Sequence, residues 1–146
     1  MATSSAPQHA DDPSIRDADA LWRRILPAWV VAVEGGGYRP SSSAFLDNHT
    51  TELSIHLAAL TTPDNALAGH PDDNLAEIWA AVHRTIGHAV VRDPTDDDPS
   101  HGLICPPPQV PNKRRKADAR RMAAQARWVV LRPPPPGAPY TADAPS

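Results

Sequence analysis

Prolines divide this sequence into short segments and limit its fold more than any other feature. The chain has 18 prolines in 146 residues, and proline lacks the amide hydrogen that helix interiors and inner strands need. Six of them lie in residues 133–146, which favours an extended or disordered tail. We predict one domain over residues 12–132, with disorder in residues 1–11 and 133–146, because the chain is too short for two ordinary domains.

The sequence predicts a cytoplasmic protein without a membrane partner. It contains no run of about 18 apolar residues, and its N-terminal residues lack the basic flank and apolar stretch of a secretory signal. Cys105 is the only cysteine, which excludes an internal disulfide. We expect Cys105 to be a small buried residue, because no basic residue stands near it in the sequence to favour a thiolate.

Hydrophobic periodicity and capping residues predict a mixture of helices and strands. Helices are expected in residues 12–27, 61–69, 71–87 and 112–127, and the 71–87 segment has the strongest helical pattern. Alternating or β-branched runs predict strands in residues 28–34, 52–60, 88–94, 100–107 and 128–131. Residues 88–107 are expected to form a hairpin. This order predicts a single-domain α+β fold, with a small mixed or antiparallel sheet packed against two or three helices.

The polar segment GGGYRPSSSAF, residues 35–45, is predicted to be a loop. Arg39 offers a planar set of donors for a carboxylate or phosphate, and Ser41, Ser42 and Ser43 add hydroxyls and backbone amides that suit an anion. The alternative is a structural turn, in which Arg39 pairs with a carboxylate and a serine caps the next element. The segment matches neither the P-loop nor the dinucleotide-binding pattern.

Histidines supply the candidate catalytic groups. His56 falls on the polar face of the predicted strand 52–60, and His101 begins a neighbouring strand, so the two could act as general acid and base. If the Arg39 loop folds over the sheet, Arg39, a serine, His56 and His101 could line one pocket. The histidine spacing and the Asp-rich segment 93–99 do not form a recognisable metal motif, so we predict no metal and no cofactor.

Charge is divided unevenly along the chain. Residues 1–112 hold six basic and fifteen acidic side chains, whereas residues 113–146 hold eight basic and two acidic ones. Such a split is typical either of a nucleic-acid surface or of a basic helix that packs on an acidic body. The acidic remainder of the chain favours the second interpretation, and nucleic-acid binding by residues 113–127 is the weaker one.

Several pieces of the sequence together resemble a known group. The segments LWRRILPAW, YRPSSSAF, LSIHLA, VVRDPTDDDPSHGLI and ARRMAAQARWVV span roughly residues 20–132. They resemble a group of small, uncharacterised bacterial proteins with an Arg-Pro-Ser-Ser loop and an Asp-Pro hairpin that ends in Pro-X-His. This resemblance implies a bacterial cytoplasmic protein and implies no particular activity.

Two main functional hypotheses follow from these residues. The first is a small binding or accessory module that recognises an anionic ligand or a protein partner through the Arg39 loop and the basic helix. The second is a small hydrolase or transferase acting on a phosphate- or nucleotide-bearing substrate, with Arg39 holding the anion and His56 and His101 exchanging protons. The sequence leaves open whether the protein is an enzyme.

Overall fold

The computed structural model describes residues 10–46, 52–107 and 110–132, and in these residues it has a single-domain α+β fold, as predicted. Six antiparallel strands form the main sheet in the order β6 (Ala89–Arg92), β7 (His101–Cys105), β4 (Leu53–Leu57), β1 (Ala20–Ile25), β5 (Asn74–Trp79) and β8 (Arg127–Val130). Two further strands, β2 (Val30–Ala32) and β3 (Tyr38–Pro40), form a separate hairpin. The predicted disordered ends lie outside the described residues, except for Ala10 and Asp11.

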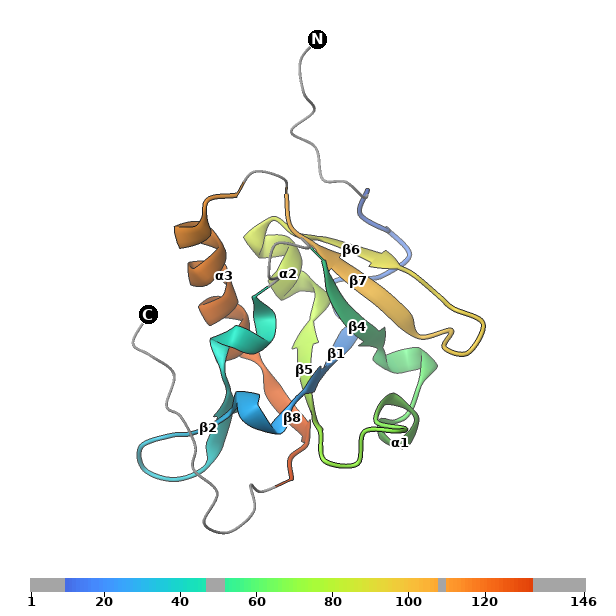
Figure 1. Ribbon diagram of the computed structural model, residues 1–146. Helices are drawn as coiled ribbons and strands as arrows, with labels where there is room; N and C mark the ends of the chain where they lie inside the picture. The colour runs from blue at the N-terminus through green and yellow to red at the C-terminus, as the bar shows by residue number, and fades with distance from the viewer. Residues whose placement is uncertain (1–9, 47–51, 108–109, 133–146) are drawn as a thin grey trace.

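The helices lie on both faces of the main sheet (Figure 1). They are α1 (Pro63–Ala66), α2 (Ala80–Ile86) and α3 (Asn112–Gln125), and three short 3-10 helices cover Pro27–Trp29, Ser42–Phe45 and Ala58–Leu60. None of the helices in the described part of the chain is long and apolar enough to cross a membrane.

The predicted helix at residues 12–27 is wrong, because its second half is the central strand β1. Leu21 and Ile25 point to one face and Trp22 to the other, and β1 pairs with β4 on one side and β5 on the other. Two aspartates of this segment stabilise turns. The Asp12 carboxylate accepts a hydrogen bond from the Ser14 amide at 2.8 Å, and that of Asp19 accepts one from the Arg16 amide at 2.8 Å.

The predicted helix at residues 71–87 is wrong in its first half. Residues Asn74–Trp79 form β5, and only Ala80–Ile86 are helical. Leu75 is buried on one face of this strand and Ala76 and Ile78 on the other, so a strand covered on both faces imitates helical spacing. Gly87 does end α2, with a left-handed φ of 101°.

Other elements agree with the sequence. In β4, Leu53, Ile55 and Leu57 are buried while Ser54 is exposed, as the alternation predicted. The β6–β7 hairpin, α3 and β8 form in the expected segments, and the Thr62 side chain caps α1. The loop predicted at residues 35–45 is partly wrong, since Tyr38–Pro40 is strand β3 and Ser42–Phe45 is a 3-10 helix.

The two faces of the main sheet bury different amounts of apolar surface. On the face that we call the core face, Leu21, Ile25, Ile55, Ile78 and Ile104 pack against α2, α3, the β2–β3 hairpin and the 3-10 helix at Ser42–Phe45. The opposite face, here the outer face, carries a small cluster at α1 made of Trp22, Ala66, Leu67 and Leu75. Figure 1 shows α3 and α1 on opposite sides of the sheet.

Replacing Gly102 by alanine is expected to destabilise the fold by about 1–3 kcal/mol. A Cβ at Gly102 would lie 2.8 Å from Ile55 Cδ1 and 2.8 Å from the Val91 carbonyl oxygen. The free energy of unfolding, measured by urea denaturation, checks this. Adding Ile55→Val removes the clashing methyl group but leaves the carbonyl, so the double variant should recover only part of the loss. An unchanged midpoint for Gly102→Ala would contradict this prediction.

Candidate functional site

His56 and His101 are brought together by the pairing of β4 with β7. They lie directly opposite each other in the strand register, and their ring centroids are 6.3 Å apart in an edge-to-face arrangement. Both side chains project from the outer face, because side chains alternate along a strand and Ile55 of β4 and Ile104 of β7 point into the core. Sequence alternation therefore placed His56 on the correct face, and the strand register supplies its partner.

Each of these histidines is held by an aspartate from the β6–β7 connection. His56 Nδ1 lies 3.1 Å from Asp98 Oδ2, and His101 Nδ1 lies 3.1 Å from Asp93 Oδ2. A carboxylate at Nδ1 favours the tautomer that carries its proton there, which leaves Nε2 to accept a proton or contact a ligand. The two side chains are 18% and 22% exposed, so both rings are partly accessible.

Ser100 supports this arrangement without being a nucleophile. Its hydroxyl lies 3.1 Å from His56 Nδ1 and donates to Asp98 Oδ1 at 2.5 Å. The composition is that of a Ser-His-Asp triad, but the serine proton is directed to the carboxylate and not to the histidine. Because Ser100 is also completely buried, it orients Asp98 and His56 and does not meet a substrate.

The electrostatics of the pair keep His56 neutral near pH 7. Burial lowers the pKa of His56, and the positive charges of His101 and Arg24 add to this effect, while Asp98 opposes it. Burial alone would raise the pKa of Asp98, but hydrogen bonds from Ser100 and the nearby histidines outweigh burial and lower it. Asp98 is therefore a carboxylate at neutral pH, next to an imidazole that is able to accept a proton.

A row of polar side chains continues from the histidines across the outer face. Trp22 lies opposite His56 on one side and Glu77 on the other, and its indole nitrogen donates to Glu77 Oε1 at 3.0 Å. Arg127, opposite Glu77 on β8, forms an ion pair with it at 3.2 Å. Matching register across five strands thus links Arg127, Glu77, Trp22, His56 and His101 into one row.

The Arg39 segment lies elsewhere. Arg39 is in β3, and its guanidinium donates to the Pro40 carbonyl at 3.1 Å. Ser41 is buried, and its hydroxyl accepts a hydrogen bond from the Ser43 amide at 3.1 Å, which caps the following 3-10 helix. Ser42 is half-buried within that helix, and Ser43 is exposed. This segment packs on the core side with α3, so the structure does not bring it together with His56 and His101, and the single pocket considered above does not form.

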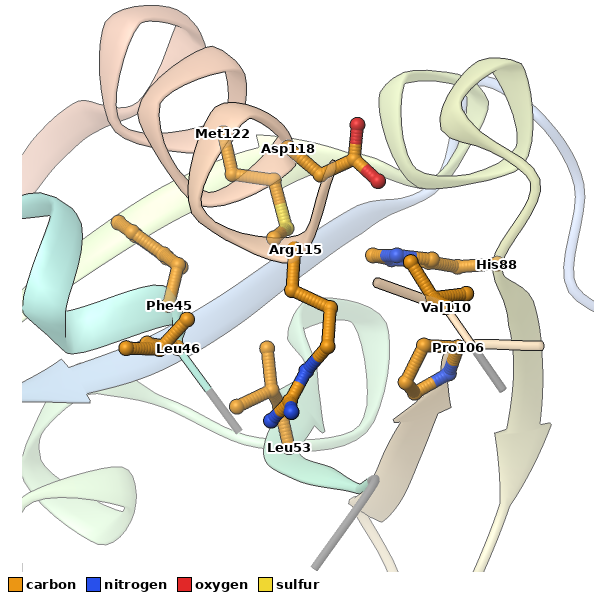
Figure 2. Close-up of a pocket in the computed structure, with 9 residues that line it drawn as sticks. All are labelled: Phe45, Leu46, Leu53, His88, Pro106, Val110, Arg115, Asp118 and Met122. Atoms are coloured by element: carbon orange, nitrogen blue, oxygen red, sulfur yellow. The ribbon is translucent and has the colours of Figure 1, made fainter. Parts of the chain in front are cut away.

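A second group of polar residues, which sequence reasoning did not single out as a site, lines a small pocket beside α3 (Figure 2). His88, Arg115 and Asp118 meet apolar side chains there, and the cavity of about 10 Å³ has room for about one water molecule. His88 Nδ1 is buried and has no hydrogen-bond partner within the described residues. The one sequence signal was Asp118, the single acid in a basic helix.

His88 stacks on a second buried histidine, His83 of α2. The ring centroids are 6.3 Å apart, with planes 22° from parallel. Burial, with smaller effects from His88 and Arg23, lowers the pKa of His83 to about 3. Burial also lowers the pKa of His88 against the opposing effect of Asp118. Both rings are therefore neutral at pH 7 and belong to the packed interior.

Cys105 is buried, as predicted, and burial raises the pKa of its thiol to about 12. Across residues 10–46, 52–107 and 110–132, no three histidine, cysteine, aspartate or glutamate side chains are grouped to hold a metal ion. No family model matches this chain, and no match was found among curated proteins or solved structures. The site geometry is therefore the basis for any functional proposal.

Ser41→Ala is expected to destabilise the protein by about 1 kcal/mol, because it removes the side-chain cap of the 3-10 helix. Ser43→Ala is the matched control, since Ser43 is exposed and contributes only its amide to this hydrogen bond. Urea denaturation of both variants checks the difference. Equal midpoints would mean that the cap contributes nothing to stability.

The fold should lose stability as the pH falls below about 6.5, the ordinary histidine value. The unfolded chain binds a proton at His83 in the range between pH 6.5 and about 3, and the folded chain does not. This difference costs roughly 1.4 kcal/mol per pH unit once His83 is protonated in the unfolded state. Urea denaturation at pH 7.5, 6 and 5 measures it. His83→Leu should flatten this dependence, and an unchanged slope in that variant would refute the assignment.

Proposed function

We propose that this protein is a small acid–base enzyme, a hydrolase or transferase, in which His56 and His101 exchange protons with the substrate. One observation carries the proposal: two imidazole rings lie 6.3 Å apart on one sheet face, each held at Nδ1 by its own aspartate. Two histidines packed only for stability need no such pair of carboxylates. An aspartate at Nδ1 orients the ring and directs its second nitrogen outward.

The two histidines have different roles in this proposal. His56, whose pKa is lowered, is neutral at pH 7 and accepts the proton of an attacking water or hydroxyl through Nε2. His101 donates a proton to the leaving oxygen. Ser100 and Asp98 position His56, and Asp93 positions His101. After each turnover, His101 takes up a proton from solvent and His56 releases to solvent the proton that it accepted.

The charges around the pair narrow the substrate class. Asp96 and Asp97 are exposed in the same connection that supplies Asp93 and Asp98. These carboxylates repel a doubly charged phosphate monoester more strongly than a singly charged diester. Among phosphate-bearing substrates, a phosphodiester therefore fits this site best.

A non-catalytic binding module is the second candidate function. The exposed basic side chains of α3, described in the next subsection, favour it, because they suit an anionic partner. The Arg39 segment contributes less to this candidate, since Ser41 and Arg39 both make local hydrogen bonds.

Hydrolysis of bis(p-nitrophenyl) phosphate, a diester, and p-nitrophenyl phosphate, a monoester, tests the enzymatic proposal. We expect turnover of the diester to exceed that of the monoester. His56→Asn and His101→Asn should each lower kcat by about 10²–10⁴-fold, the usual contribution of a general acid or base. His70→Asn is the matched control, because His70 is a partly exposed histidine outside the pair.

The dependence of kcat/KM on pH gives a second measurement. Because the pKa of His56 is lowered, activity should persist below pH 6.5 and fall only at more acidic pH. If kcat/KM of His56→Asn no longer falls at acidic pH, this result would support His56 as the base. Diester turnover that is unaffected by both histidine substitutions, or no ester turnover at all, would rule out catalysis by this pair.

A further inference from the structure

The exposed face of α3 carries a row of positive charge. The residues of this helix that are buried against the core are Asp118, Ala119, Met122 and Ala123. At 100° per residue, the opposite side of the helix presents Lys113, Arg120 and Arg121, and Lys116 is exposed at the edge of that side. Figure 1 shows α3 at the periphery of the molecule, on the side of the sheet that we call the core face. We call these four residues the basic face.

The positive charges of the basic face are not neutralised by acidic side chains of the described residues. No carboxylate in the described part of the chain lies within ion-pair distance of the basic face. The ion pair seen on α3 joins Arg114 to Asp118 of the same helix at 3.3 Å. Several acids elsewhere pair with arginines outside α3, namely Asp11 and Asp17 with Arg84, Asp12 with Arg92, and Asp73 with Arg24.

In the predicted basic segment 112–127, Arg127 does pair with Glu77 of the body, but the basic face has no such partner among the described residues. The sequence offered the packing of a basic helix on an acidic body as the favoured reason for the charge split. On the basic face, Lys113, Lys116 and Arg121 are exposed and Arg120 is half-buried, while the other side of the helix is fixed in the core. Such a surface attracts a polyanion.

We propose that the basic face of α3 binds duplex nucleic acid through its phosphate backbone. The four side chains extend over about 12 Å of a rigid helix, and duplex DNA carries one phosphate charge per roughly 1.7 Å of its axis. Ala117 and Ala124 lie in the same face, and their small side chains allow the helix to approach the duplex closely. The major groove of B-DNA is wide enough to admit an α-helix.

The composition of the basic face favours nucleic acid over an acidic protein. Protein interfaces usually depend on apolar or aromatic residues near their centre. The exposed large apolar residues in the described part of the chain are Leu26, Leu60 and Trp79, and none of them is on α3. The basic face also lacks side chains that commonly read base edges, apart from the cations themselves. It therefore recognises the backbone with little sequence preference.

This surface is separate from the histidine pair. His56 and His101 project from the outer face of the sheet, whereas α3 packs on the core face. A variant of one surface leaves the other intact, so failure of the nucleic-acid proposal and failure of the enzymatic proposal are distinguishable.

Fluorescence anisotropy of the full chain with a labelled 20-base-pair duplex tests the proposal, using DNA and RNA duplexes of one arbitrary sequence. With up to four phosphate contacts, the slope of log K against log salt concentration should lie near −3. Affinity should then fall by about 10²-fold between 50 and 200 mM salt. Binding of only one of the two duplexes identifies which nucleic acid the surface prefers.

Two triple variants with equal net charge separate surface recognition from general electrostatics. Lys113→Gln, Lys116→Gln and Arg121→Gln together should lower affinity at least tenfold and reduce the salt slope to about −1. The control combines Ala28→Glu, Ala59→Glu and Ala68→Glu at exposed positions outside α3 and should retain most of the affinity. Circular dichroism confirms that both variants fold.

Three results would overturn the proposal. The first is no duplex binding by the unmodified chain at 50 mM salt. The second is an equal loss of affinity in both triple variants, which would mean that net charge alone is responsible. The third is competition by polyglutamate at the same charge concentration as effectively as by unlabelled duplex, which would assign the basic face to an acidic protein partner instead.

Discussion

The register between β4 and β7 is the constraint on which the rest of the structure depends. It places Ile55 opposite Gly102, where the missing Cβ leaves room for Ile55 and for the Val91 carbonyl of the next strand. The same register places His56 opposite His101 on the other face. A shift of one residue would turn the histidines into the apolar core and Ile55 out of it, because side chains alternate along a strand. Core packing and the histidine pair are thus fixed by one set of hydrogen bonds.

A cation on the core face of the central strand connects the main sheet to the segment around Ser41. The Arg23 guanidinium donates to the carbonyls of Ala44 and Ser54 at 2.5 and 2.8 Å and lies 6.0 Å from the Trp29 ring. Burial lowers the pKa of Arg23 to about 10, which still leaves it charged at pH 7. The segment after β3 packs on this side of the sheet because its backbone carbonyl at Ala44 accepts a hydrogen bond from the buried Arg23 guanidinium. A buried cation needs such acceptors, since water reaches it poorly.

The sequence predicted the elements whose signals are local. Alternation identified β4, turn residues identified the β6–β7 hairpin, and Thr62 and Gly87 marked real helix ends. It failed for β1 and β5, since both faces of these inner strands are covered and the resulting pattern has helical spacing. In the candidate site, too, only the features with local signals could be predicted. The face of His56 could be predicted from neighbours in sequence, but its distance from His101 depends on register, and the pocket at His88 and Asp118 depends on how α3 packs.

Much of the positive charge of the basic C-terminal part of the sequence lies on α3, while Arg127 pairs with Glu77 on the outer face. The outer face carries His56 and His101 beside the acidic β6–β7 connection, while the core-face side carries α3 with its basic face. A polyanion held at α3 is separated from the histidines by the full thickness of the sheet and its apolar core, so within one molecule it does not reach them. If both surfaces act as proposed, they therefore bind different molecules. The acidic connection then has a further consequence, since it repels a polyanion from the histidine side and directs it toward α3.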